Sequence, residues 1–259
     1  MLANRTIALY HAVEAGSGRR GAASVTPQKG APMPQTAHVF AEGAGAGHMG
    51  YLLFLPAAYG RNGHLRWPLI LFLHGAGERG HDIERLRGHG ITRVVEERAD
   101  RFPFVVVSPQ CPEGSRWVDH LDTLGALLGE ITRAYAIDEQ RVYLTGMSMG
   151  GQGAWAMALR YPERFAAVAP ICGPRLSGTD LVERMRVLVG TPVWVFHGAK
   201  DEVVPLEHSM AMADALEEVG GTVRLTVYPE AGHDAWTETY NNPALYEWFL
   251  QHALALAGD

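Results

Sequence analysis

Residues 141–160 read RVYLTGMSMGGQGAWAMALR. A strand-like run opens this stretch, G-x-S-x-G follows, and a helix-like run closes it. In that context the motif forms a sharp turn that presents its serine, Ser148, at the edge of a sheet. Gly146 and Gly150 flank the serine because a strained turn has no room for side chains two residues to either side. The stretch therefore predicts a nucleophilic Ser148 within an α/β chain.

The motif alone occurs by chance in many chains, so its meaning depends on the partners that a nucleophilic serine needs. A histidine must take the serine proton and a carboxylate must orient that histidine, and after this turn the chain order is serine, acid, histidine. Asp201 follows the apolar run 192–196, and His233 follows the run 223–228 and a glycine turn. Both lie just past the carboxyl ends of predicted strands, where open parallel sheets place their active sites. We predict Ser148, Asp201 and His233 as a catalytic triad.

An oxyanion-binding loop is predicted upstream of the nucleophile. Residues 69–73 are apolar throughout, as in a central parallel strand covered by helices, and HGAGERG follows them at 74–80. The small residues of this turn leave backbone N–H groups exposed. One oxyanion donor should be the N–H of Met149, directly after the nucleophile. The second should be the N–H of Ala76, with Gly77 as the next candidate.

Other acidic and histidine side chains are weaker candidates for the triad. Glu202 adjoins Asp201 but should point elsewhere, and Asp234 adjoins the predicted base without easy reach of its far ring nitrogen. His74 and His197 each precede a glycine at the end of a predicted strand. We expect these two histidines to hold loops by hydrogen bonds rather than to act in catalysis.

Composition predicts one domain of enzyme size. The chain has 259 residues, of which 47% are hydrophobic, and a formal net charge of -6. It has no lysine or arginine cluster, which argues against nucleic acid as a partner, and no apolar run long enough to span a membrane. Cys111 and Cys172 are isolated, so neither a disulfide framework nor a zinc site is expected. We predict that the protein needs no metal ion or other cofactor.

These segments together resemble the α/β-hydrolase superfamily, and within it compact lidless esterases related to acetyl xylan esterases, feruloyl esterases and polyhydroxybutyrate depolymerases. The likeness is greatest to a bacterial group labelled predicted peptidase or prolyl-oligopeptidase-like, and it covers about residues 36–256. It rests on YLLFLP (51–56), HGAGERG (74–80), SPQCP (108–112), GMSMGG (146–151), HGAKD (197–201) and GHDAW (232–236). The resemblance implies the same triad, with Met149 and Ala76 as the oxyanion donors.

The predicted architecture is an α/β-hydrolase fold, with a mostly parallel eight-stranded sheet, helices on both faces and no large cap. Strand and helix patterns alternate from residue 68 onward, while the first two strands have no helix between them and should form an antiparallel edge. Only about twenty residues separate Pro170 from Pro192, too few for a multi-helix cap. The strand candidates are 38–41, 50–55, 68–73, 104–108, 141–145, 166–170, 192–196 and 223–228, and the helix candidates are 83–98, 120–135, 150–160, 207–219 and 244–256.

The N-terminal stretch is the part of the chain without a motif. Residues 1–35 are rich in Gly, Ala and Pro, so we predict a flexible or partly ordered tail ahead of a single catalytic domain, residues 36–259. Its apolar run at 6–9 is too short for the core of a signal peptide. We expect a cytoplasmic protein by default and leave export and the oligomeric state open.

The expected substrate is a small-molecule or polysaccharide-linked ester. An open cleft favours short-acyl or hydroxycinnamoyl (feruloyl-type) esters, since long acyl chains need an apolar tunnel to bury methylenes worth ~0.8 kcal/mol each. Trp117 and Trp236 are predicted to contact the substrate from loops near the cleft, with plain loop packing as the alternative. Gly77 and Glu78 are predicted contacts from the oxyanion loop. For Glu78 the alternative is a surface ion pair with Arg79.

Three other functions stay open at this point. A peptidase of prolyl-oligopeptidase-like type would use the same triad, but it would need subsites for an extended chain, and the sequence has no added propeller or binding domain. A thioesterase or acyltransferase would differ only in the leaving group or the acceptor. A catalytically silent binding protein is disfavoured because it would have no reason to keep every triad position in order.

Overall fold

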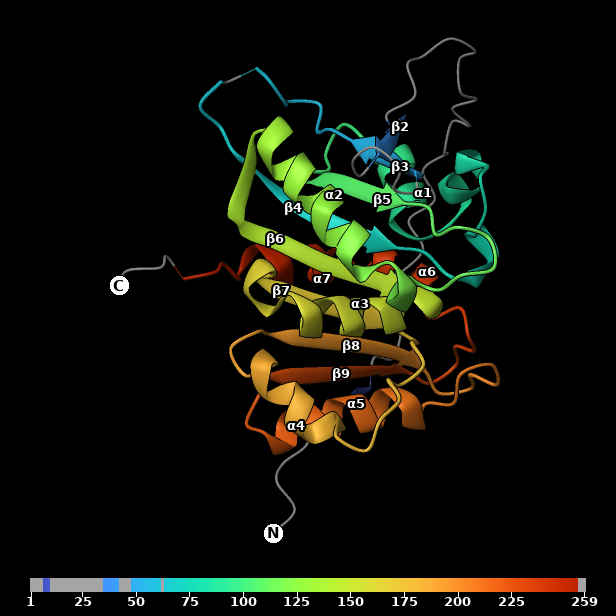
Figure 1. Ribbon diagram of the computed structural model, residues 1–259. Coiled ribbons are helices and arrows are strands. Elements are labelled where there is room, and N and C mark those ends of the chain that lie inside the picture. Colours follow the sequence, from blue (N-terminus) through green and yellow to red (C-terminus); the bar gives the residue numbers. More distant parts are fainter. Residues whose placement is uncertain (1–6, 10–34, 42–47, 62, 256–259) are drawn as a thin grey trace, which may run out of the picture.

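A nine-stranded sheet forms the centre of the protein (Figure 1). The computed structural model describes residues 7–9, 35–41, 48–61 and 63–255. The strand order is β1-β9-β8-β7-β6-β4-β5-β3-β2, parallel from β1 to β5 and antiparallel at β3 and β2. The strands are β1 Ile7–Leu9, β2 Gln35–Ala41, β3 His48–Phe54, β4 Trp67–Leu73, β5 Val105–Pro109, β6 Ile137–Met147, β7 Ala167–Ile171, β8 Val193–Gly198 and β9 Val223–Tyr228.

Strand β4 lies near the middle of this sheet, between β6 and β5. All seven of its residues are buried, as expected of a parallel strand with helices on both sides. Its register sets Leu73 opposite Gly146 of β6. The loops that follow these two strands therefore start side by side at the carboxyl edge of the sheet, which lies to the right in Figure 1.

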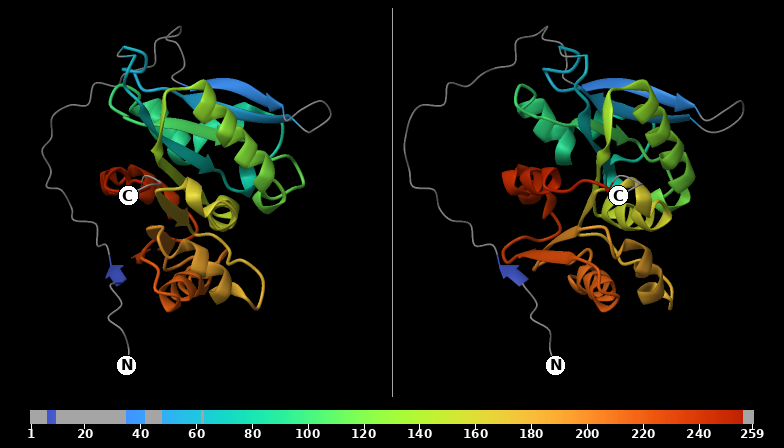
Figure 2. Two further views of the ribbon diagram at one scale, coloured as in Figure 1. Left: turned by 60° about the vertical axis from the view of Figure 1, so that its left-hand side comes forward. Right: turned by 90° about the vertical axis from the view of Figure 1, so that its left-hand side faces the viewer.

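Helices cover both faces of the sheet and make three layers (Figure 2). One face packs against α2, α3, α4 and α5 and the other against α1, α6 and α7, each through its own hydrophobic core. The α-helices are α1 Gly90–Glu97, α2 Leu121–Ala134, α3 Met149–Arg160, α4 Leu181–Met185, α5 Glu207–Glu218, α6 Trp236–Asn241 and α7 Pro243–Leu250. The short 3-10 helices are η1 Ala76–Glu78, η2 Ile83–Gly88, η3 Trp117–Asp119, η4 Pro162–Arg164 and η5 Arg186–Leu188. No described helix is long and apolar enough to cross a bilayer.

The predicted strands are all present, as β2 to β9, and the expected antiparallel edge is confirmed by the pairing of β2 with β3 and of β3 with β5. β1 is a ninth strand that the sequence patterns did not reveal, because three residues are too few to show a period. It pairs in parallel with β9. It lies within the predicted N-terminal tail, most of which (1–6 and 10–34) falls outside the described residues.

Two predicted helices differ from the structure, and two short helices were not predicted. The candidate 83–98 is divided into η2 and α1, because Gly90 has a φ of +61° and approaches Phe72 so closely that a Cβ would lie 2.6 Å from its ring. The last helix ends at Leu250 instead of continuing to 256. The short helices α4 and α6 were not predicted. Between β7 and β8 the chain forms only α4 and η5, so no large cap covers this part of the fold.

Glycines let helix α3 start directly on the end of β4. A Cβ on Gly150 would lie 1.9 Å from the carbonyl oxygen of Leu73, and one on Gly146 would lie 2.3 Å from the carbonyl oxygen of Gly150. Real Cβ atoms do not approach backbone so closely, so the first turn of α3 tolerates no side chain here. The sequence predicted that Gly146 and Gly150 are needed because side chains would not fit there, and these close approaches confirm that reason.

We expect Gly150→Ala to lower the free energy of unfolding by about 3 kcal/mol or more, because the added methyl group overlaps backbone that cannot move aside. The matched control is Gly129→Ala in α2, where a Cβ meets nothing within 4 Å. That change should be neutral or should stabilise by up to about 1 kcal/mol, since alanine favours helix over glycine. Urea unfolding of both variants measures the difference, and equal effects would contradict the close-packing argument.

Candidate active site

Ser148 lies at the turn between β6 and α3 in a conformation that non-glycine residues rarely adopt. Its backbone has φ 54° and ψ -117°, so the turn is strained, and its N–H is held by the carbonyl of Ile171 at 2.9 Å. The serine is half-buried at the carboxyl edge of the sheet. The elbow geometry that G-x-S-x-G predicts is thus present.

The three residues predicted as a triad are brought together by the fold. His233 follows β9, and its Nε2 lies 2.8 Å from the Ser148 Oγ. Its Nδ1 lies 2.7 Å from the Oδ2 of Asp201, which follows β8. Three loops that are far apart in sequence therefore build one continuous line of hydrogen bonds from hydroxyl to imidazole to carboxylate.

The carboxylate of Asp201 is buried and accepts several hydrogen bonds. Its Oδ1 receives the backbone N–H groups of Val203 and Val204, each at 2.9 Å. Burial raises the pKa of Asp201, but the bonds from His233 and from these two N–H groups outweigh it, so the pKa lies below its ordinary value. The carboxylate is ionised at neutral pH and can stabilise a positive charge on the imidazole.

His197 lies in contact with the carboxylate of Asp201. Its Nε2 faces two acceptors, the carbonyl of Val204 at 2.8 Å and the Asp201 Oδ2 at 3.2 Å, so this nitrogen carries the proton. Its Nδ1 accepts from the hydroxyl of Ser209 at 2.7 Å. Burial lowers the pKa of His197 below its ordinary value, although the bond to Val204 and the charge of Asp201 raise it. His197 holds a loop, as expected from the sequence.

His74 ties the loop after β4 to the loop after β5. Its Nδ1 donates to the carbonyl of Gly75 at 2.5 Å, and its Nε2 accepts from the N–H of Cys111 at 2.9 Å. Burial lowers the pKa of His74 to about 4, more than the bond to Gly75 raises it. The imidazole is therefore neutral at neutral pH, and its structural role agrees with the prediction.

The two predicted oxyanion donors both lie at helix starts beside Ser148. Met149 is the first residue of α3 and Ala76 is the first of η1, positions whose N–H groups have no partner within their own helix. The loop of η1 touches the elbow, because a Cβ on Gly75 would lie 3.8 Å from the Cβ of Ser148. Ala76 and Gly77 are exposed at this rim.

Glu78 and Arg79 do not form the ion pair that was the alternative for them. Arg79 donates to the carbonyls of Ala76 at 2.9 Å and Ser115 at 3.2 Å, which fixes the loop. The Oε2 of Glu78 is buried 3.7 Å from the His74 Nδ1 and has no hydrogen-bond partner among the described residues. This oxygen is enclosed by protein atoms, so a substrate hydroxyl could reach it only if the loop moved.

The prediction that Trp117 contacts the substrate is wrong, and the alternative, packing within its loop, agrees with the structure. Trp117 has no exposed surface, and its indole N–H donates to the carbonyl of His74 at 2.9 Å. The ring is drawn inward because Gly153 of α3 leaves room for it: a Cβ there would lie 2.6 Å from the Cβ of Trp117. Trp236 is half-buried and packs edge-on against His233 with ring centroids 5.3 Å apart, so it stays available as a contact.

A groove of about 550 Å³ runs along the outer face of α3, and sequence reasoning missed it. Gln152, which lines it, lies one helical turn after Ser148 and so about 6 Å from that residue along the helix axis. Its apolar lining is Val118, Leu121, Ala156, Leu159, Leu176 and Val187, and its other lining residues include Arg116, Arg160 and Arg184. No sequence signal could have found it, because its walls come from α2, α3 and the α4 region.

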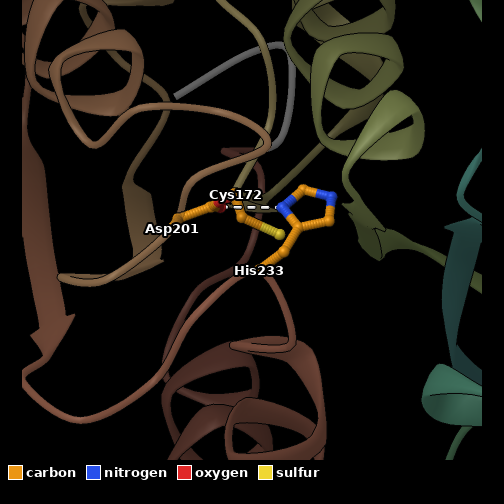
Figure 3. A group of neighbouring side chains, drawn as sticks. All are labelled: Cys172, Asp201 and His233. Atoms are coloured by element: carbon orange, nitrogen blue, oxygen red, sulfur yellow. Dashed lines mark hydrogen bonds and ion pairs between the residues drawn. The ribbon is translucent and has the colours of Figure 1, made fainter.

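Cys172 is buried beside Asp201 and His233, a contact that sequence reasoning also missed. It directly follows β7 and has a φ of 40°. Its sulfur, a carboxylate oxygen of Asp201 and a ring nitrogen of His233 all lie within 4.8 Å of one another (Figure 3). Burial raises the pKa of Cys172, so it is a neutral thiol. Its place at the carboxyl end of a strand, the rule that selected Asp201 and His233, was the available signal.

Comparison with known proteins points to hydrolases. A family model described as "Dienelactone hydrolase family" matches residues 44–247. The bifunctional acetylxylan esterase/xylanase XynS20E of Neocallimastix patriciarum is 30% identical over 142 residues, which is 53% of this chain and 20% of that protein. The chain thus spans about a fifth of the length of this curated relative.

Solved structures described as esterases share the fold of this chain. A structure described as a thermostable esterase has a TM-score of 0.71 and 33% identity, and the match covers 85% of this chain and 63% of the other. A ferulic acid esterase has a TM-score of 0.65 and 18% identity over 83% of this chain and 95% of its own. The second likeness shows the fold alone. The predicted α/β-hydrolase fold is confirmed.

The neutral, buried His74 predicts a pH-dependent stability. The pKa of His74 is about 4 in the folded protein and ordinarily about 6.5. Between pH ~4 and ~6.5 the imidazole is therefore protonated in the unfolded chain but neutral in the folded protein. Its contribution to the free energy of unfolding is thus complete above pH ~6.5 and falls by about 3 kcal/mol as the pH drops to ~4. In His74→Gln this loss should be absent from the pH profile.

Urea unfolding between pH 7 and 4 makes the comparison, with His81→Gln as the control because that exposed imidazole lies on the same loop. The control should keep the wild-type profile. A His74→Gln profile as steep as the wild-type one would contradict the assignment.

Proposed function

Because the chain belongs to the dienelactone hydrolase family, we propose that it is a serine carboxylesterase that hydrolyses short-acyl or hydroxycinnamoyl esters. The observation that carries this proposal is the line of hydrogen bonds from the Ser148 Oγ to the His233 Nε2, 2.8 Å, and from the His233 Nδ1 to the Asp201 Oδ2, 2.7 Å. These distances suit proton transfer from a hydroxyl to an imidazole whose ring is held by a carboxylate.

In the proposed first step the Ser148 Oγ attacks the ester carbonyl and its proton passes to the His233 Nε2. The ionised Asp201 carboxylate stabilises the imidazolium that results, because it is already bonded to the Nδ1 proton. The imidazolium then gives its proton to the alcohol that leaves. An acyl group remains on Ser148, and water repeats the sequence to release the acid.

The backbone N–H groups of Met149 and Ala76 are proposed to hold the oxyanion of each tetrahedral intermediate. Both are first residues of helices, so their N–H groups point outward without an intrahelical partner. The adjacent loop is held by Arg79 and His74, which keeps the donors in place as charge develops on the oxygen. Such fixed donors typically contribute about 3 to 4 kcal/mol to transition-state stabilisation.

The proposed substrate is a small or polysaccharide-linked ester, in keeping with the acetylxylan esterase to which the chain is similar. With Trp117 buried, the groove along α3 is the apolar surface available for an aryl group near the nucleophile. Trp236 packs against His233 and Gly77 is exposed beside Ala76, so both are proposed to contact the substrate, with Glu78 as a further contact from the same loop. These contacts favour a compact aromatic or short acyl group over a long chain.

Ser148→Ala should fold normally and lose ester turnover by about three orders of magnitude or more, because the nucleophile is removed. Hydrolysis of p-nitrophenyl acetate measures the loss, and a fluorophosphonate probe should label the wild type but not the variant. The matched control is Ser108→Ala, since the buried Ser108 hydroxyl has no hydrogen-bond partner in the described part of the chain. Retention of more than about a tenth of the activity in Ser148→Ala would refute the proposed nucleophile.

Acyl-chain preference should separate the proposed substrates from the alternatives. We expect kcat/KM on p-nitrophenyl esters to be highest for short acyl groups and to fall towards sixteen carbons, because an open site leaves extra methylenes in water. Methyl ferulate should be turned over, whereas a peptide anilide and an acyl thioester should be poorer substrates. A maximum at the long-chain end would exclude the open site, and a preference for the anilide or thioester would replace the esterase by a peptidase or thioesterase.

Ala156→Leu tests whether the aryl group of the substrate binds in the groove along α3, because Ala156 lines that groove. The added side chain should raise KM for methyl ferulate several-fold more than for p-nitrophenyl acetate. Equal effects on both substrates would show that the aryl group binds elsewhere.

A further inference from the structure

Cys172, Asp201 and His233 form a cluster of metal-ligating groups within the site. Their ligand atoms lie within 4.8 Å of one another, and Figure 3 shows the thiol and the carboxylate both directed at the imidazole. Among the described residues this is the one group of three or more such side chains close enough to share an ion. The cluster joins three loops, after β7, β8 and β9.

The donor set selects a particular kind of ion. Thiolate, imidazole and carboxylate are the ligands of zinc, with bonds of about 2.0 to 2.3 Å, so tetrahedral partners stand roughly 3.3 to 3.8 Å apart. The Asp201 oxygen and the His233 Nδ1 are closer than that, at 2.7 Å, and the sulfur is within 4.8 Å of both. Small side-chain rotations would therefore give the spacing that such an ion needs.

We propose that this cluster is an inhibitory site for a thiophilic divalent cation such as Zn²⁺, bound by the Cys172 Sγ, the His233 Nδ1 and an Asp201 oxygen. The ion takes the place of the proton between His233 and Asp201. Two anionic ligands balance its charge, which offsets the cost of burying it. A fourth position is left for water from the cleft.

The proton balance explains why binding would stop catalysis. The Cys172 thiol gives its proton to solvent as the sulfur binds the ion, because a coordinated thiol is deprotonated. The imidazole stays neutral, and its proton moves from the Nδ1 to the Nε2 when the Nδ1 binds the ion. The Nε2 then donates to the Ser148 Oγ and can no longer accept the serine proton.

The ion can reach the cluster from the side on which the His233 imidazole is exposed to solvent. The side chain of His233 is 20% exposed, whereas those of Asp201 and Cys172 are buried, so the ring is the entry point. Cys111, the other buried free thiol, bonds instead to the hydroxyl of Ser115 and belongs to no such cluster. It therefore gives a matched comparison for Cys172.

The test uses Co²⁺ and Zn²⁺ on the full chain. Co²⁺ should give the wild type a thiolate-to-cobalt absorption band that Zn²⁺ removes by competition, and Cys111→Ala should keep this band. Cys172→Ala and Cys172→Ser should lack it. Absence of the band in the wild type and Cys111→Ala, or its persistence in both Cys172 variants, would overturn the proposal.

Inhibition of ester hydrolysis by Zn²⁺ is measured in the same variants. Each rate is divided by the rate of the same protein in EDTA. We expect Zn²⁺ to inhibit the wild type and Cys111→Ala, and the inhibition constant to rise on the order of 100-fold without Cys172. Equal inhibition in all variants would place the inhibitory ion elsewhere. This second arm rests on the proposed triad, whereas the cobalt band does not, so failure of the esterase proposal would leave the binding test intact.

Discussion

The contact between the first turn of α3 and the end of β4 sets the position of Ser148 and of the loop after β4 at the carboxyl edge of the sheet. A Cβ on Gly150 would lie 1.9 Å from the carbonyl oxygen of Leu73, so helix and strand meet backbone to backbone. The helix must then begin at Met149, and Ser148 is left in the strained turn with a φ of 54°. The same contact holds the loop after β4 against the elbow, because Gly75 packs on Ser148.

A second backbone contact brings Asp201 and His233 together. A Cβ on Gly198 would lie 2.1 Å from the carbonyl oxygen of Gly232, so the loops after β8 and β9 pack without side chains between them. Asp201 and His233 follow these glycines by three residues and one residue. His197 remains neutral because burial lowers its pKa, and its Nε2–H is directed at the Asp201 carboxylate without adding a charge. Tight packing and hydrogen bonding therefore orient the His233 imidazole.

The buried aromatic and histidine side chains act as supports for the loops of the site. Trp117 binds the carbonyl of His74, and His74 joins the loops after β4 and β5 through Gly75 and Cys111. These groups have no exposed surface to offer a substrate. Their role is to keep the predicted oxyanion loop rigid, which matters because electrostatic stabilisation of a transition state depends on donors that are already in place.

The sequence by itself determined the eight strands β2 to β9, the elbow at Ser148 and the order of Asp201 and His233, because periodicity, glycine placement and chain order are local or one-dimensional signals. It could not decide that Trp117 is buried, that a groove follows α3, or that Cys172 lies within 4.8 Å of Asp201 and His233. Each of these depends on side chains from separate loops that meet only when the sheet is assembled. Their distances are consequences of packing, which no single stretch of the chain encodes.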